Sequence, residues 1–141
     1  MKFPIYLSSL ILLLGCATAD TPNEENHISV PEDTIEVRKP ADDNYSQGRV
    51  YISQVKRATV DGKPVLLVRG SLPEGCSRLL KADYDFASED VIKLEMASWR
   101  PADMACTQVL VEFSYIYDDI DSEKLQNVSH VEYNDERKEL E

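Results

Sequence analysis

The strongest constraint on the fold is a two-residue alternation of apolar and polar side chains that recurs along the middle of the chain. In residues 80–86, for example, Leu80, Ala82, Tyr84 and Phe86 alternate with polar side chains. Successive side chains of a β-strand point to opposite faces, so this period indicates half-buried strands. The same reading predicts strands at 49–53, 63–72, 80–86, 92–96 and 108–117, with a final candidate at 128–133.

Turn signals separate these segments. Asp61-Gly62 is a typical two-residue hairpin turn, because glycine tolerates a positive φ. Pro73-Glu74-Gly75 and Ser88-Glu89-Asp90 interrupt the chain in the same way. No segment has an amphipathic helical period, and 141 residues suffice for about one domain. The pattern predicts an antiparallel β-sandwich or barrel of about six to seven strands.

The first residues have the features of a targeting signal. Lys2 precedes an apolar run that ends at Gly15 and is too short to span a bilayer as a helix. The junction Leu13-Leu14-Gly15-Cys16 resembles the bacterial lipobox. That resemblance implies cleavage before Cys16, acylation of Cys16 (palmitate included) and a lipid anchor in the cell envelope. Ala17 rather than Asp follows Cys16, so we expect the outer membrane where there are two membranes, and the side of the membrane stays open. The alternative is an ordinary signal peptide cleaved elsewhere.

The number of cysteines agrees with a location in the cell envelope. The chain has three cysteines, and acylation of Cys16 would leave Cys76 and Cys106 as an even pair in an oxidising compartment. The alternative, two thiols in a metal site, lacks a neighbouring histidine or further cysteine. We therefore expect a disulfide between Cys76 and Cys106, and no metal.

Charge divides the chain into parts. Residues 49–117 contain nine basic and nine acidic residues, whereas the flanking segments carry the excess that gives the net charge of −11. We expect a signal peptide at 1–15, an acidic lipidated tether at 16–48, the sandwich at 49–133 and an acidic tail at 134–141. The tether has room for a short strand at 34–37. The acidic balance argues against binding to nucleic acid or electrostatic docking on anionic lipid.

Two cysteine-containing segments resemble a family of small, mostly uncharacterised bacterial lipoproteins. They are Gly70-Ser71-Leu72-Pro73-Glu74-Gly75-Cys76 and Arg100-Pro101-Ala102-Asp103-Met104-Ala105-Cys106-Thr107-Gln108. The resemblance covers about residues 49–133. It implies an immunoglobulin-like sandwich with the Cys76–Cys106 bridge, and it carries over no catalytic residue. The acidic segment from Asp118 to Glu123 departs from this pattern and leaves the placement of the last strand open.

Catalytic and metal-binding motifs are weak. The two histidines, His27 and His130, belong to no nucleophile or zinc motif, so we expect neither an enzyme nor a cofactor. Asp119, Asp121 and Glu123 have the spacing of calcium ligands. The glycine and glutamate that an EF-hand loop requires later are absent, and a solvated acidic turn is the simpler interpretation.

Trp99, Arg100 and Asp103 form the candidate interaction loop, because they begin a segment that Cys106 pins at its far end. Tryptophan and arginine are common at the centres of protein interfaces, and a disulfide lowers the entropy cost of presenting a loop. The alternative is that Trp99 packs over the disulfide and Arg100 bonds to loop carbonyls. The predicted function is a non-catalytic envelope module that binds a protein partner, as an assembly factor or inhibitor. The alternative is a lipoprotein that binds a small ligand or Ca²⁺.

Overall fold

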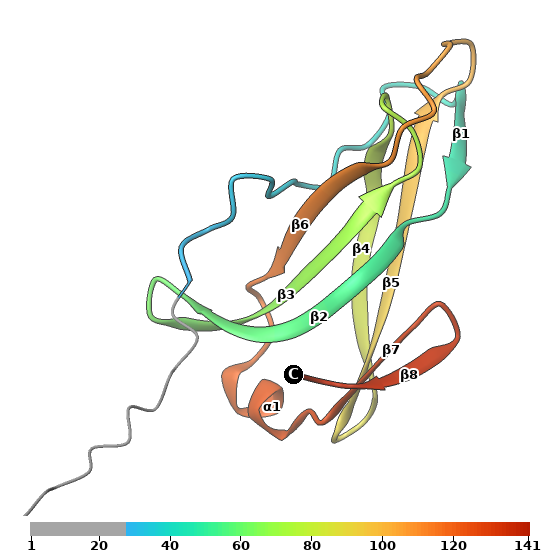
Figure 1. Cartoon of the computed structure of the whole chain (residues 1–141). Coiled ribbons are helices and arrows are strands. Elements are labelled where there is room, and N and C mark those ends of the chain that lie inside the picture. Colours follow the sequence, from blue (N-terminus) through green and yellow to red (C-terminus); the bar gives the residue numbers. More distant parts are fainter. Residues whose placement is uncertain (1–27) are drawn as a thin grey trace, which may run out of the picture.

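The computed structural model describes residues 28–141 as two β-sheets packed face to face (Figure 1). Its elements are the strands β1 (Tyr45–Gly48), β2 (Tyr51–Val60), β3 (Lys63–Leu72), β4 (Arg78–Ser88), β5 (Val91–Pro101) and β6 (Val111–Tyr117), the helix α1 (Ser122–Asn127), and the strands β7 (His130–Tyr133) and β8 (Glu136–Glu139). The predicted all-β sandwich is confirmed. The barrel alternative is wrong, because the strands divide into two separate sheets.

One sheet has three strands in the order β2-β3-β6, all antiparallel. The other has five, with β5 at its centre and β4 along one edge of it. Strands β1 and β7 share the opposite edge of β5, at its two ends. Strand β7 runs parallel to β5, and β8 pairs with β7 as a hairpin.

Apolar side chains from both sheets meet between them. Leu66 and Val68 of β3 face Ile92 and Leu94 of β5, and all four are buried. Their neighbours Val65 and Leu67 point to the other face of β3 and are also buried, against Ala58, Ile28 and Ile116. Strand β3 is therefore covered on both faces, which explains its nearly continuous apolar sequence.

Strand β4 differs in detail from the predicted alternation. The pairing with β5 shifts between Leu79 and Lys81, and this bulge turns the side chains that precede it. Leu79 is consequently the fully buried residue, while Leu80, which we expected on the core face, is half-buried. A bulge of one residue cannot be seen in an alternating pattern when two leucines are adjacent.

The segment expected to be a tether is partly built into the sandwich. Ser114 of β6 exchanges hydrogen bonds with the backbone of Asp33 and Ile35, and Arg38 N donates to Leu79 O of β4 at 2.8 Å. This N-terminal segment, residues 28–44, therefore bridges the outer strands of the two sheets, and the short strand that we placed at 34–37 is a single bridge at Thr34. It then continues into β1. Ile28 and Ile35 supply the apolar contacts that hold it there.

The segment expected to be an acidic tail is also structured. Residues 136–139 form β8, Leu140 is buried in the main core, and Glu141 O accepts a hydrogen bond from Arg57 N of β2 at 3.0 Å. Helix α1 was not predicted, because six residues are too few to show a helical period. It buries Leu125 and is capped by Asp121, whose Oδ1 accepts from Glu123 N and Lys124 N.

Candidate functional site

The two cysteines form a disulfide at one end of the sandwich, as predicted. Cys76 lies between β3 and β4, Cys106 lies between β5 and β6, and their Cα atoms are 5.5 Å apart. Gly75 N also donates to Thr107 O at 2.9 Å, so the backbone joins the same two connections. We call this end of the molecule, with residues 73–77 and 102–110, the disulfide end; it is uppermost in Figure 1.

Trp99 is half-buried at the end of β5. Its indole Nε1 donates to Arg38 O, and its ring meets that of Tyr45 edge to face, with centroids 6.1 Å apart. These contacts fasten the N-terminal segment and β1 to the end of β5. Trp99 therefore has a structural role at the base of the predicted interaction loop.

Arg100 and Asp103 are placed differently. Arg100 Nε lies 3.1 Å from Glu74 Oε2, an ion pair that links β5 to the connection holding Cys76. Asp103 lies in the β5–β6 connection and is exposed. The Glu74 carboxylate lies near both cysteine sulfurs as well, but sulfurs bonded to each other offer no thiolate to a metal.

Sequence reasoning missed the most exposed apolar side chains of the disulfide end. Met104, Val109 and Leu110, all in the β5–β6 connection, have exposed fractions of 52%, 61% and 59%. Val111 and Tyr51, at the starts of β6 and β2, are also exposed. Val109 and Val111 belong to the predicted strand at 108–117, but β6 begins only at Val111, and both side chains are exposed. The run Val109-Leu110-Val111, which breaks the alternation, was the available signal.

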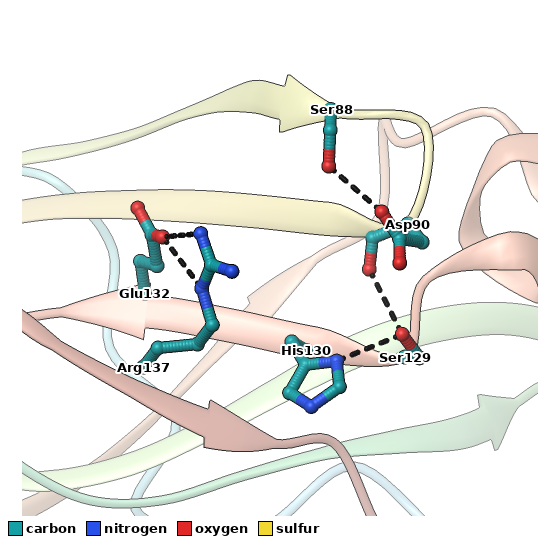
Figure 2. Close-up of polar contacts among 6 residues, drawn as sticks. All are labelled: Ser88, Asp90, Ser129, His130, Glu132 and Arg137. Atoms are coloured by element: carbon teal, nitrogen blue, oxygen red, sulfur yellow. Dashed lines mark hydrogen bonds and ion pairs between the residues drawn. The ribbon is translucent and has the colours of Figure 1, made fainter.

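At the opposite end, polar groups surround the carbonyl of Asp90 in the β4–β5 turn (Figure 2). Asp90 O accepts from the backbone N–H groups of Ser129 and His130 and from Ser129 Oγ. Ser129 Oγ also lies 2.9 Å from His130 Nδ1. The hydroxyl carries one hydrogen, so whether it donates to Asp90 O or to the ring depends on the tautomer of His130. The backbone bonds of the cluster fix the start of β7 beside β5.

The Asp90 carboxylate accepts a hydrogen bond from Ser88 Oγ at 2.8 Å, and this bond holds the pKa of Asp90 below its usual value. The backbone N–H of Asp90 and the nearby His130 act in the same direction. Farther along β7, Glu132 pairs with Arg137 of β8 across the hairpin (Figure 2). These contacts stabilise the turn and the hairpin.

The remaining sequence predictions concern the chain before residue 28. Cys16, the signal peptide and residues 16–27 of the tether lie outside the described residues, so acylation stays a prediction. Within residues 28–141, no helix has the length and apolar character needed to cross a membrane.

The fold and the bridged connections define a disulfide-containing β-sandwich domain. A family model described as the ORF11 beta-sandwich domain matches residues 66–140, from within β3 to the residue after β8. The chain belongs to this family. Neither the curated proteins nor the solved structures include a match.

Proposed function

We propose that this chain is a lipid-anchored, non-catalytic protein of the bacterial cell envelope that binds a protein partner through its disulfide end. The observation that carries the proposal is the exposure of Met104, Val109 and Leu110 on one bridged connection. Exposed apolar side chains gathered at one place on a domain are typical of interaction surfaces.

The connection that holds these side chains is restrained at its start and at its middle. The disulfide joins Cys106 to the β3–β4 connection, and the contacts of Trp99 and Arg100 fix the end of β5. A restrained loop loses less conformational entropy on binding than a free one. Trp99 and Arg100 thus hold the connection in place. The contact surface itself would be formed by Met104, Val109 and Leu110.

The position of the N-terminal segment suggests that the disulfide end is not held at the membrane and is free to bind a partner. Ile28 N donates to Thr59 O, near the β2–β3 turn and far from the disulfide end (Figure 1). A lipid on Cys16 would therefore tether the domain from the side of the β2–β3 turn. The intervening residues reach at most about 40 Å when extended. The disulfide end would face away from the membrane that holds the anchor.

In-cell photo-crosslinking tests the proposal. A photoreactive residue at Leu110 should give a discrete adduct with an envelope protein, and the same probe at Lys63, beside the β2–β3 turn, should give none. The Leu110 probe in a chain that also carries Cys16→Ser should leave the membrane fraction and lose most of the adduct. Equal adducts at Leu110 and Lys63, or none at either, would contradict the binding surface. Firm membrane association of Cys16→Ser would contradict the anchor.

A further inference from the structure

A hollow opens between the outer strands β4 and β6, away from the disulfide end. Its volume is about 540 Å³. The lining consists of three tyrosines, four aspartates and one alanine: Tyr84, Tyr115, Tyr117, Asp83, Asp85, Asp118, Asp119 and Ala82. We call it the tyrosine pocket. None of the contacts that support the proposed protein-binding end involves these residues.

The rings of the pocket are held at steep angles to one another. Tyr117 is nearly perpendicular to Tyr84, with centroids 5.7 Å apart, and it meets Tyr115 at 4.8 Å and 75°. Tyr117 is buried and its hydroxyl donates to Asp83 O at 3.3 Å. The Tyr84 hydroxyl reaches Asp119 O at 3.4 Å. Tyr84 and Tyr115 remain half-buried, so parts of both rings are open to the pocket.

The charge of the lining is mainly negative. In the described part of the chain the lining holds four carboxylates and no basic side chain. Lys81 pairs with Glu95 at 2.7 Å and with Asp83 at 3.7 Å, so it offsets part of the charge of Asp83, while Asp85, Asp118 and Asp119 supply the rest. Burial is the main cause that raises the pKa values of Tyr84, Tyr115 and Tyr117, and Asp119 adds to each. The negative potential that opposes tyrosinate formation would favour a bound cation.

Next to the pocket, the chain already contains a contact between a cation and an aromatic ring. The Lys124 ammonium lies 5.6 Å from the centroid of the Phe86 ring, and Phe86 meets Tyr84 edge to face at 6.1 Å. Cations are attracted to the faces of aromatic rings, and sets of such rings recognise quaternary ammonium groups. A divalent metal ion gains most from a shell of oxygen ligands and little from aromatic walls. The composition of the pocket therefore favours an organic cation.

We propose that the tyrosine pocket binds an organic cation, an alkylammonium or guanidinium group, with the tyrosine rings as walls and the aspartates as counter-charges. The group comes either from a small amine or from a lysine or arginine side chain of a peptide. The assignment is independent of the proposed protein-binding end, since the two surfaces share no residue.

NMR titration of the full-length chain in detergent, with ¹³C-labelled tyrosine rings, tests the proposal. The probes are tetramethylammonium chloride, N-acetyl-lysine amide and N-acetyl-arginine amide, each against sodium chloride of equal ionic strength. We expect saturable shifts of the Tyr84 and Tyr115 resonances with at least one probe, and none at Tyr51. Saturation by tetramethylammonium alone identifies a small amine as the source, and saturation by the amino-acid amides identifies a peptide side chain.

Variants separate the pocket from general charge effects. Tyr84→Leu removes a ring and should weaken binding about tenfold, whereas Tyr84→Phe keeps the ring and should bind nearly as the parent chain does. Asp119→Asn, an exposed substitution that leaves the rings in place, should weaken binding several-fold. Its matched control, Asp103→Asn at the disulfide end, should change nothing. The proposal is overturned if no probe saturates, or if Asp119→Asn and Asp103→Asn bind alike.

Discussion

The carbonyl oxygen of Asp90 shows how much a single residue can organise. It accepts three hydrogen bonds from Ser129 and His130, and these bonds place β7 parallel to β5. Parallel strands need a long connection, and here it runs through β6 and α1. The acidic turn at 118–123, which departed from the expected pattern, supplies Asp121 as the cap of that helix.

The side chain of Asp90 provides a prediction at the residue scale. Ser88→Ala removes the main cause that lowers the pKa of Asp90, so this pKa should rise toward the ordinary aspartate value of about 4. In the parent chain the stabilisation by ionised Asp90 is complete above the unfolded-state pKa and is lost as pH falls through the lower folded-state pKa. The free energy of unfolding of Ser88→Ala should therefore fall less steeply with acidification.

Carboxyl NMR titration of Asp90 measures this shift, with urea unfolding at several acidic pH values as the second readout. Ser46→Ala, at an exposed position of β1, is the matched control and should leave the Asp90 titration unchanged. An Asp90 pKa that is the same with and without the Ser88 hydroxyl would contradict the assignment.

Single residues also mark the limit of prediction from the sequence. Cys76 and Cys106 could be paired because the count of cysteines left few alternatives, and the disulfide confirms it. The aspartates and tyrosines of the tyrosine pocket could not be assigned. The pocket residues on β4 are separated by about 35 residues from those on and after β6. They come together only because β4 and β6 lie opposite each other. Val109 and Leu110 could have been noticed, since three consecutive apolar residues contradict a half-buried strand.

At the scale of elements, the two flanking segments close the sandwich. The N-terminal segment bonds to β6 and β4 on one side, and Leu140 and Glu141 reach β7 and β2 on the other. Both were expected to be solvated because of their acidic residues. Their few apolar side chains, Ile28, Ile35 and Leu140, determine the outcome instead, since charged neighbours can remain on the exposed face.

Leu140→Ala tests the closure by the C-terminal segment. Leu140 is 6% exposed, so its truncation should lower the free energy of unfolding by about 2–4 kcal/mol through lost burial and a residual cavity. Glu139→Ala, one residue earlier and exposed, should change it by no more than about 0.5 kcal/mol. Urea unfolding followed by Trp99 fluorescence compares the two. Equal small effects would mean that residues 136–141 contribute little to the fold.

The strands themselves were mostly predictable, since their alternation depends on local sequence. Segments 63–72, 80–86 and 92–96 all lie within observed strands. Their partners and directions were less accessible, because pairing depends on contacts far apart in the sequence. The parallel β5–β7 pair and the split edge of β5 are such cases. Helix α1 is too short to be detected by period, although Asp121 before Ser122 is a capping signal.

At the scale of the whole molecule, the disulfide end, the entry of the N-terminal segment and the tyrosine pocket lie at different places on the domain. The disulfide end carries exposed apolar side chains on a restrained connection, while the N-terminal segment enters beside the β2–β3 turn. The tyrosine pocket lies between β4 and β6, away from the disulfide end. This arrangement allows a domain tethered by one end to present the other to a partner, with a cation-binding side face that works independently.

Hydroxyl-radical footprinting tests the central claim most directly, because it reports on many side chains at once without an inserted probe. The reactivities of Met104, Val109 and Leu110 should be several-fold lower in freshly isolated envelope membranes than in the purified chain in detergent. Val37, which is exposed on the N-terminal segment, should react equally in both. Unchanged reactivity of the three residues, or equal protection of Val37, would contradict the disulfide end as the binding surface.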